Sequence, residues 1–145
     1  MSLKVKDVMT HNVAFVSPTT PVIEAARLMQ KHNVGIIPVC DNNGLVGVVT
    51  DRDIVVRNVA HGTDFQDTNV KDIMTSKVYT VTPETDVESV YQTMAKQQIR
   101  RVPVTSGNQL VGIVALGDIA TNQQYDTEAA EALSEISKPS RPQNF

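Results

Sequence analysis

The chain has 145 residues, of which 41% are hydrophobic and 20% are charged, and its formal net charge is −3 at pH 7. Such a composition is typical of a globular protein that buries a core as one domain or as two small ones. The chain lacks the basic balance of a dedicated nucleic-acid-binding protein. No apolar run approaches the roughly 18 residues that a membrane span requires, and the N-terminus has no signal-peptide core. The sequence therefore predicts a cytoplasmic protein.

The residue types that most often carry catalysis or hold metals are sparse. Cys40 is the only cysteine, which excludes an intramolecular disulfide. Its place at the end of an expected strand favours a small half-buried residue over a nucleophile. His11, His32 and His61 share no spacing, so we expect no metal site. Because no nucleophile–base pair and no phosphate-binding glycine loop is visible, the sequence argues against an enzyme.

The sequence contains one segment twice. Residues 5–54 align without a gap with residues 70–119, so that VKDVMT matches VKDIMT and LVGVVTDRDI matches LVGIVALGDI. Two repeats are too few for a solenoid, and a pair related by a pseudo-twofold axis is the natural arrangement. We expect a first domain over residues 1–60, a linker over 61–69, a second domain over 70–122, and a C-terminal helix with a mobile tail over 123–145.

Each repeat opens with a predicted strand and helix. The short apolar runs 13–16 and 78–81 favour strands. Thr20 is the expected N-cap of the first helix, with Pro21 at its first position, and Thr85 with Glu88 matches a capping box in the second repeat. Apolar residues then recur at the spacing of one buried helix face. These stripes are Val22, Ala25, Ala26 and Met29 in the first repeat, and Val87, Val90, Tyr91 and Met94 in the second.

Two strands and a helix complete each repeat, so that the predicted order is β-α-β-β-α. Asn33 is expected to end the first helix in a left-handed conformation. Strands over 36–39 and 102–104 lead through turns at 41–44 and 106–108 to buried strands such as 46–49. The next helix begins at Asp51, with Thr50 as its N-cap. One more helix is expected over residues 126–136, before Pro139 and Pro142 end regular structure. Its apolar face would comprise Ala129, Ala130, Leu133 and Ile136.

Polar groups gather where the strand over residues 46–49 ends. Thr50 supplies a hydroxyl and Asp53 a carboxylate, next to unpaired backbone N–H groups of the helix start. In open α/β structures small ligands bind at such strand ends. The same two residues also suit an N-cap and a first-turn acid that complements the helix dipole, with no ligand present. The residues alone leave both interpretations open.

The duplicated pattern VKDVMT…VSPTTPVIEAARLM…IIPV…LVGVVTDRDI closely resembles a pair of CBS domains, a tandem called a Bateman module, over residues 3–122. The resemblance implies an α/β (α+β) fold of two β-α-β-β-α units packed sheet to sheet with pseudo-twofold symmetry, and a disc-shaped homodimer. Members of the family commonly bind adenosine-containing ligands in two clefts between the units. The chain leaves no room for a fused enzyme or channel, so we expect it to regulate an unknown protein partner in trans.

The resemblance assigns residues to a first cleft. Gly47, Thr50 and Asp53 match the family's ribose-contacting Gly-x-x-Thr/Ser-x-x-Asp pattern. Arg100 and Arg101 would face the phosphates, one more than the other, because successive strand residues point to opposite faces. The alternative is that these arginines are solvated or paired with acidic side chains. The slot for the base would comprise Val48, Met74, Ile99 and Tyr79, which either stacks on adenine or simply packs.

The second cleft departs from the family pattern. Gly112 and Asp118 remain, but Ala115 replaces the hydroxyl-bearing residue. This cleft also lacks an aromatic residue and the arginines, so it is expected to be weak, differently selective or empty. Its other candidate residues are Met9, Ala14, Val34, Gly35, Ile36 and Ile113.

The resemblance therefore predicts a regulatory sensor of an adenine nucleotide that requires no cofactor. AMP, ADP or ATP suits the arginine pair better than adenosine or S-adenosylmethionine, while NAD and diadenosine nucleotides stay open. The alternative is a dimeric interaction scaffold with empty clefts, which works through its dimer face or through the helix over residues 126–136. We expect no direct contact with nucleic acid or membrane.

Overall fold

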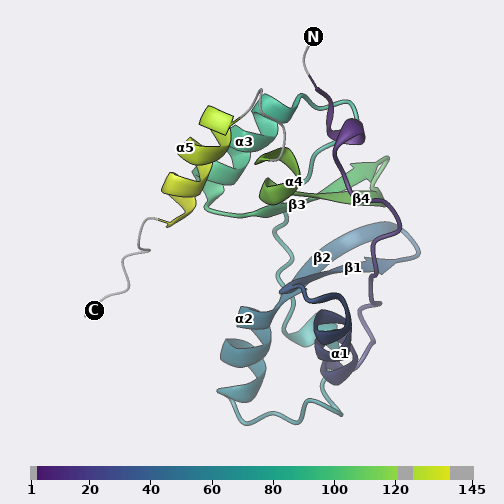
Figure 1. The fold of residues 1–145 in the computed structure, drawn as a ribbon. Helices are drawn as coiled ribbons and strands as arrows, with labels where there is room; N and C mark the ends of the chain where they lie inside the picture. Colours follow the sequence, from purple (N-terminus) through teal and green to yellow (C-terminus); the bar gives the residue numbers. More distant parts are fainter. Residues whose placement is uncertain (1–2, 121–125, 138–145) are drawn as a thin grey trace. The chain divides into compact units, whose positions relative to one another are not determined.

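The computed structural model describes residues 3–120 and 126–137, with the side chains of 126–131 excepted (Figure 1). The chain forms two compact units. Unit 1 comprises Met1–His11, Tyr79–Ser106 and Val111–Phe145, and unit 2 comprises Asn12–Val78 and Gly107–Leu110. Each unit therefore combines the body of one repeat with the opening segment of the other.

Unit 2 contains a two-stranded sheet and its helices. Helix α1 (Val22–His32) leads to the strands β1 (Ile36–Asp41) and β2 (Gly44–Thr50), which pair antiparallel with a bulge between Val39 and Cys40. Helix α2 (Asp51–Asp53) continues directly into the π-helical η2 (Ile54–Val59). A short 3₁₀ turn, η3 (Val70–Asp72), opens the second repeat.

Unit 1 repeats this arrangement. It contains η1 (Val5–Asp7), α3 (Val87–Gln97), β3 (Arg101–Ser106), β4 (Gln109–Ala115), α4 (Leu116–Ala120) and α5 (Asp126–Ser137), with the first residues of β4 grouped with unit 2. Helix α5 lies beside α3 (Figure 1). Because each unit has a two-stranded antiparallel sheet with helices, the predicted α+β fold is confirmed.

The strands expected at 13–16 and 78–81 are reduced to single bridges. Val16 pairs in parallel with Val39, and Val81 pairs with Val104. Pro18 and Pro83 follow two residues after these bridges. Proline has no N–H with which to continue a ladder, so pairing ends after one residue.

The threonine caps predicted for the two long helices are wrong. The Thr20 hydroxyl accepts the N–H of Ser17 at 3.0 Å, and the Thr85 hydroxyl accepts the N–H of Thr82 at 3.0 Å. Neither α1 nor α3 has a side-chain cap. Each threonine closes a local turn before its helix, which takes the hydroxyl away from the helix N–H groups.

Backbone carbonyls from other segments satisfy these helix starts instead. In unit 2 the N–H of Val22 donates to the carbonyl of Thr68 at 2.9 Å, and the N–H of Ile23 donates to that of Phe65 at 3.0 Å. In unit 1 the N–H of Val87 donates to the carbonyl of Leu3 at 3.0 Å. Residues 61–69, expected as a linker, thus contribute to the start of α1.

The VKD segments of the two repeats are exchanged between the units. Val5 of the first repeat is fully buried in the core of unit 1, where its N–H donates to the carbonyl of Thr85 at 2.9 Å. Val70 of the second repeat is fully buried in unit 2, where its N–H donates to the carbonyl of Thr20 at 2.8 Å. Each core is therefore completed by a residue from the other repeat.

Most of the predicted helix faces agree with the structure. All four stripe residues of α3 are buried, and in α1 only Ala26 is half-buried rather than buried. Asn33 ends α1 at φ 53°, which confirms the left-handed C-cap. None of the described helices is long and apolar enough to cross a membrane.

The buried face of the last helix differs from the predicted one. Ala132 is buried and Ile136 packs against the core of unit 1, whereas Leu133 is 47% exposed. The prediction for Leu133 is therefore wrong. The side chains of Ala129 and Ala130, together with residues 121–125 and 138–145, lie outside the described residues.

Candidate functional site

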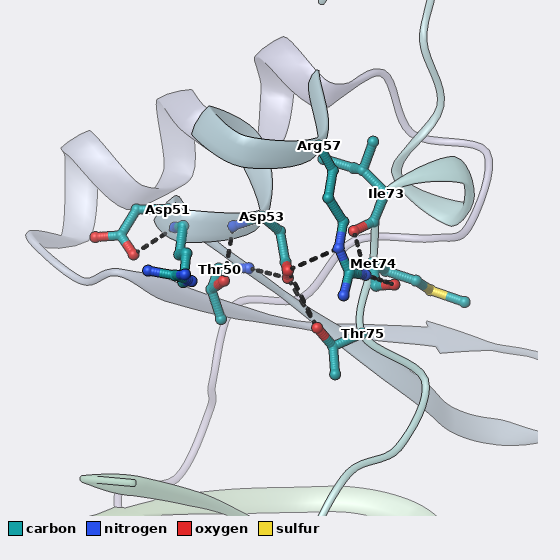
Figure 2. A network of polar contacts seen from close by, with 8 residues as sticks. Thr50, Asp51, Asp53, Arg57, Ile73, Met74 and Thr75 are labelled. Carbon is teal, nitrogen blue, oxygen red and sulfur yellow. Dashed lines mark hydrogen bonds and ion pairs between the residues drawn. The ribbon is translucent and has the colours of Figure 1, made fainter. Parts of the chain in front are cut away.

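The end of β2 in unit 2 forms a closed capping box. Thr50 has an extended backbone, and its hydroxyl accepts the N–H of Asp53 at 3.0 Å. In return, Oδ2 of Asp53 accepts the N–H of Thr50 at 3.0 Å (Figure 2). The predicted N-cap is confirmed. The arrangement fixes a carboxylate in the first turn of the helix, where the helix dipole favours negative charge.

The Asp53 carboxylate has further partners in the second repeat's opening segment and in η2. The hydroxyl of Thr75 lies 3.1 Å from Oδ2 and 3.2 Å from Oδ1. Nε of Arg57 lies 3.7 Å from Oδ1. Asp53 is only 6% exposed, and it is the one charged residue buried among those described. A buried carboxylate is costly unless it is paired and hydrogen-bonded, and these contacts meet that requirement.

Arg57 also binds the backbone beside Thr75. Its Nη1 donates to the carbonyl of Ile73 at 3.3 Å and to that of Met74 at 3.1 Å (Figure 2). The N–H of Thr75 donates to the carbonyl of Val48 at 2.8 Å, and the N–H of Val48 donates to the carbonyl of Thr75 at 2.9 Å. Residues 73–75 are therefore held to both β2 and η2.

Gly47 permits this close approach. A Cβ at Gly47 would lie 2.7 Å from the carbonyl oxygen of Thr75 and 3.0 Å from Sδ of Met74. Real Cβ atoms essentially never approach another heavy atom to less than 3.0 Å. The glycine of the Gly-x-x-Thr-x-x-Asp pattern thus has a packing role of its own.

The candidate residues of the first predicted cleft fall into two sets. Val48, Thr50, Asp53 and Met74 come together in unit 2 around the contacts just described. Tyr79, Ile99, Arg100 and Arg101 belong to unit 1. Tyr79 and Arg100 are exposed, Arg101 is half-buried, and Ile99 packs against the core of unit 1. The assignment of this second set to the ligand held at Asp53 stays a prediction.

The candidates of the second predicted cleft divide in the same way. In unit 1 the N–H of Ile113 donates to the carbonyl of Thr10 at 3.0 Å, and Sδ of Met9 lies 2.8 Å from where a Cβ on Gly112 would be. Asp118, which follows Ala115 at the start of α4, is exposed. The remaining candidates, which are half-buried in unit 2, are Ala14, Val34, Gly35 and Ile36.

Sequence reasoning missed Thr75 and Arg57. Thr75 ends the repeated VKD-x-MT motif and Arg57 stands four residues after Asp53, a spacing that brings two helix residues together. The repetition of this motif marked the segment that contains Thr75, but it gave no indication that the segment packs beside the other repeat. The four-residue spacing of Asp53 and Arg57 was visible in the sequence and favoured an ion pair between them.

Cys40 and the side chains able to ligate a metal are the other groups that could carry chemistry. Cys40 is half-buried, and burial together with the neighbouring Asp41 raises the pKa of its thiol, which disfavours the reactive thiolate. Within the part of the chain that the structure describes, no group of three or more His, Cys, Asp or Glu side chains could hold a metal ion.

Comparison with known proteins agrees with this architecture. The CBS domain family model matches residues 5–58 and 70–124. The chain is 49% identical to the CBS domain-containing protein YhcV of Bacillus subtilis over 133 residues, which are 92% of this chain and 94% of that protein. The relative thus consists almost entirely of the part that this chain matches.

Two solved structures are also similar. The crystal structure of Hypoxic Response Protein I with two coordinated zinc ions gives a TM-score of 0.76 at 34% identity, and covers 83% of this chain and 98% of that one. The CBS domain pair of protein MJ0100, in complex with 5′-methylthioadenosine and S-adenosyl-L-methionine, gives a TM-score of 0.73 at 30% identity over 83% of this chain and 95% of that one. The chain belongs to the CBS-domain family and carries two tandem CBS domains.

Proposed function

We propose that this chain is a regulatory module that binds an adenine nucleotide, AMP, ADP or ATP, with the ribose at the Asp53 carboxylate. The observation that carries the proposal is a buried carboxylate fixed at a helix start by the Thr50 capping box. The related pair in MJ0100 holds two ligands that share an adenosine moiety with these nucleotides. A hydrogen bond from a ribose hydroxyl to such a carboxylate is worth about 1.5–3 kcal/mol.

The carboxylate has acceptor capacity left for a diol. An ionised carboxylate offers about four lone-pair positions. The N–H of Thr50 uses one on Oδ2, and the single proton of the Thr75 hydroxyl is shared between both oxygens. Nε of Arg57, at 3.7 Å, is too distant for a hydrogen bond. One position on Oδ1 therefore stays free, and a second becomes available when the Thr75 proton bonds to one oxygen alone, so that each hydroxyl of a ribose has an acceptor.

The proposed module acts in trans, as a homodimer, on a protein partner. Arg100 and Arg101 supply the positive charge that would favour phosphorylated ligands. Binding regulates the partner only if the nucleotide prefers one arrangement of the protein over another, because equal affinity for two states shifts neither. The module itself performs no catalysis in this proposal.

A second candidate is a ligand-free interaction scaffold. It is favoured by the contacts of Asp53, which satisfy the carboxylate without any ligand. Three large apolar side chains of η2 are also exposed and offer a surface to another protein, namely Val55, Val56 and Val59.

A thermal-shift panel separates the two candidates. AMP, ADP, ATP, NAD and S-adenosylmethionine are added to the wild type and to Asp53→Asn, Asp118→Asn and Arg101→Ala. At a hundredfold excess over its dissociation constant, a nucleotide should stabilise the wild type by about 2.7 kcal/mol. We expect Asp53→Asn to abolish this gain, the matched Asp118→Asn to retain it, and Arg101→Ala to weaken the binding of AMP, ADP and ATP more than that of S-adenosylmethionine, which has no phosphate. A scaffold would show no shift with any compound.

A further inference from the structure

Two side chains outside the family pattern contact the proposed ribose carboxylate. Thr75 donates to Asp53 across both carboxylate oxygens, and Arg57 faces Oδ1 while it binds the carbonyls of Ile73 and Met74 (Figure 2). Neither side chain is needed to close the capping box, which Thr50 and Asp53 complete by themselves. Their contacts therefore call for a separate explanation.

We propose that Thr75 and Arg57 are positioning residues, which set the orientation of the Asp53 carboxylate for the ribose diol. The inference rests on the proposed nucleotide site and adds to it the residues that shape it. It also implies that the site in unit 2 is assembled from both repeats, because Asp53 comes from the first repeat and Thr75 from the second.

Thr75 fixes the plane of the carboxylate. Rotation about the last side-chain bond of an aspartate is soft, with a broad distribution of angles. The N–H of Thr50 holds only Oδ2, at 3.0 Å, and leaves that rotation free. The Thr75 hydroxyl lies nearly equidistant from both oxygens, at 3.1 and 3.2 Å, and so selects one plane. The acceptor positions that remain then point in fixed directions.

Arg57 fixes the place of Thr75 relative to Asp53. The guanidinium is a rigid planar fork, so binding two carbonyls through Nη1 also determines where Nε lies. The side chain of Arg57 is 52% exposed. Solvent therefore weakens its attraction to the carboxylate, and its contribution is mainly geometric. The bonds to residues 73 and 74 keep the neighbouring hydroxyl against Asp53.

The test compares AMP with 2′-deoxy-AMP, which lacks one of the two ribose hydroxyls that would donate a hydrogen bond to Asp53. Dissociation constants are measured by calorimetry for the wild type, Thr75→Val, Thr75→Ser and the matched control Thr10→Val, whose residue holds the same place in the first repeat. The wild type should prefer AMP by about tenfold or more. We expect Thr75→Val, which keeps the shape but loses the hydroxyl, to bind AMP about tenfold more weakly and to lose that preference. Thr75→Ser and Thr10→Val should both behave as the wild type.

Arg57 is tested in the same way with Arg57→Met and Arg57→Lys. We expect both to reduce the preference for AMP over 2′-deoxy-AMP, because lysine restores the charge but not the fork. A merely structural role for either residue would lower thermal stability and leave this preference unchanged. Circular dichroism at the assay temperature checks that each variant is folded.

The outcomes separate the two proposals. A wild type that binds no adenine nucleotide contradicts the proposed function. Binding that is lost in Asp53→Asn but equal to, or tighter than, the wild type in Thr75→Val overturns the positioning role alone and leaves the ribose site standing. Loss of the diol preference in Thr75→Val with rescue by Thr75→Ser supports both.

Discussion

The two units start equivalent helices in different ways. In unit 2 the helix after β2 has a threonine cap, and its aspartate is buried among partners from both repeats. In unit 1 the helix after β4 follows Ala115, and Asp118 is exposed. The surrounding packing is nevertheless the same, since Thr75 pairs with Val48 and Thr10 with Ile113 through the same backbone bonds. After duplication, the repeats have kept their apolar packing and differ in polar chemistry.

The units also differ where the exchanged segments dock. In unit 1, Nζ of Lys4 lies 2.6 Å from a carboxylate oxygen of Asp86. At the equivalent place in unit 2, Asn69 pairs with Pro21 through the backbone. Unit 1 therefore has a charged pair at the docked segment, Lys4 with Asp86, whereas unit 2 has one at the start of the helix after β2, Arg57 with Asp53.

The largest difference is expected from removing the two aspartates. Asp53→Ala removes one side of the capping box and leaves the hydroxyl of Thr75 and the charge of Arg57 without their acceptor, so we expect a loss of about 2–4 kcal/mol in the free energy of unfolding. Asp118→Ala changes an exposed residue and should cost no more than about 0.5 kcal/mol. Urea unfolding of both variants without ligand measures the difference. Equal losses in the free energy of unfolding would mean that Asp53 and Asp118 contribute equally to stability.

Exchanging the residues that precede the two helices, Thr50 and Ala115, should change stability by an intermediate amount. Thr50→Ala leaves the N–H of Asp53 without its acceptor and should destabilise the protein by about 1 kcal/mol. Ala115→Thr places a hydroxyl three residues before Asp118, completes the capping-box pattern, and should stabilise by up to about 1 kcal/mol. Thermal unfolding of the two single variants and of the double variant provides the measurement. If Ala115→Thr has no effect, the missing threonine hydroxyl at position 115 does not explain the difference between the helices.

The smallest effect concerns Lys4. A hydrogen bond to Asp86, together with its negative charge, raises the pKa of Lys4 in the folded protein. The resulting stabilisation is fully present below the pKa of lysine in the unfolded chain and is lost as the pH rises through the folded value. We expect Lys4→Met to lower the melting temperature slightly at neutral pH and not at strongly alkaline pH. Because the pair is exposed, added salt should also reduce the difference. If the difference in melting temperature between the wild type and Lys4→Met is the same at every pH, the ion pair is not its cause.

Local patterns were sufficient for most of the fold. The periodic stripes located α1 and α3, and Asn33 marked the end of α1 because its left-handed conformation depends on the residue itself. The predicted cap at Thr20 failed for one local and one nonlocal reason. Its hydroxyl belongs to a preceding turn, while carbonyls of residues 65 and 68 approach the helix start from elsewhere in the chain.

The candidate site could be predicted only where its contacts are local. Thr50 and Asp53 lie three residues apart, so the N-cap and the acidic residue in the first turn could be predicted from the sequence, and the structure shows that they close a capping box. Thr75 lies in the other repeat, and its contact with Asp53 arises because the opening segments are exchanged. Alternating apolar residues do not encode that exchange, since Val5 and Val70 would suit either core equally well.

The exchanged segments also impose an order on folding during synthesis. Nearly all of unit 2 is contiguous, from Asn12 to Val78, so it can collapse while the second repeat is still being made. The first eleven residues, however, belong to unit 1 and must wait for α3 and β3 to leave the ribosome. During that interval Val5 has no core to enter, and the core of the second repeat can later accept the corresponding η1 segment of another copy. Slower synthesis of the second repeat should therefore favour an exchange of this segment between two copies of the chain.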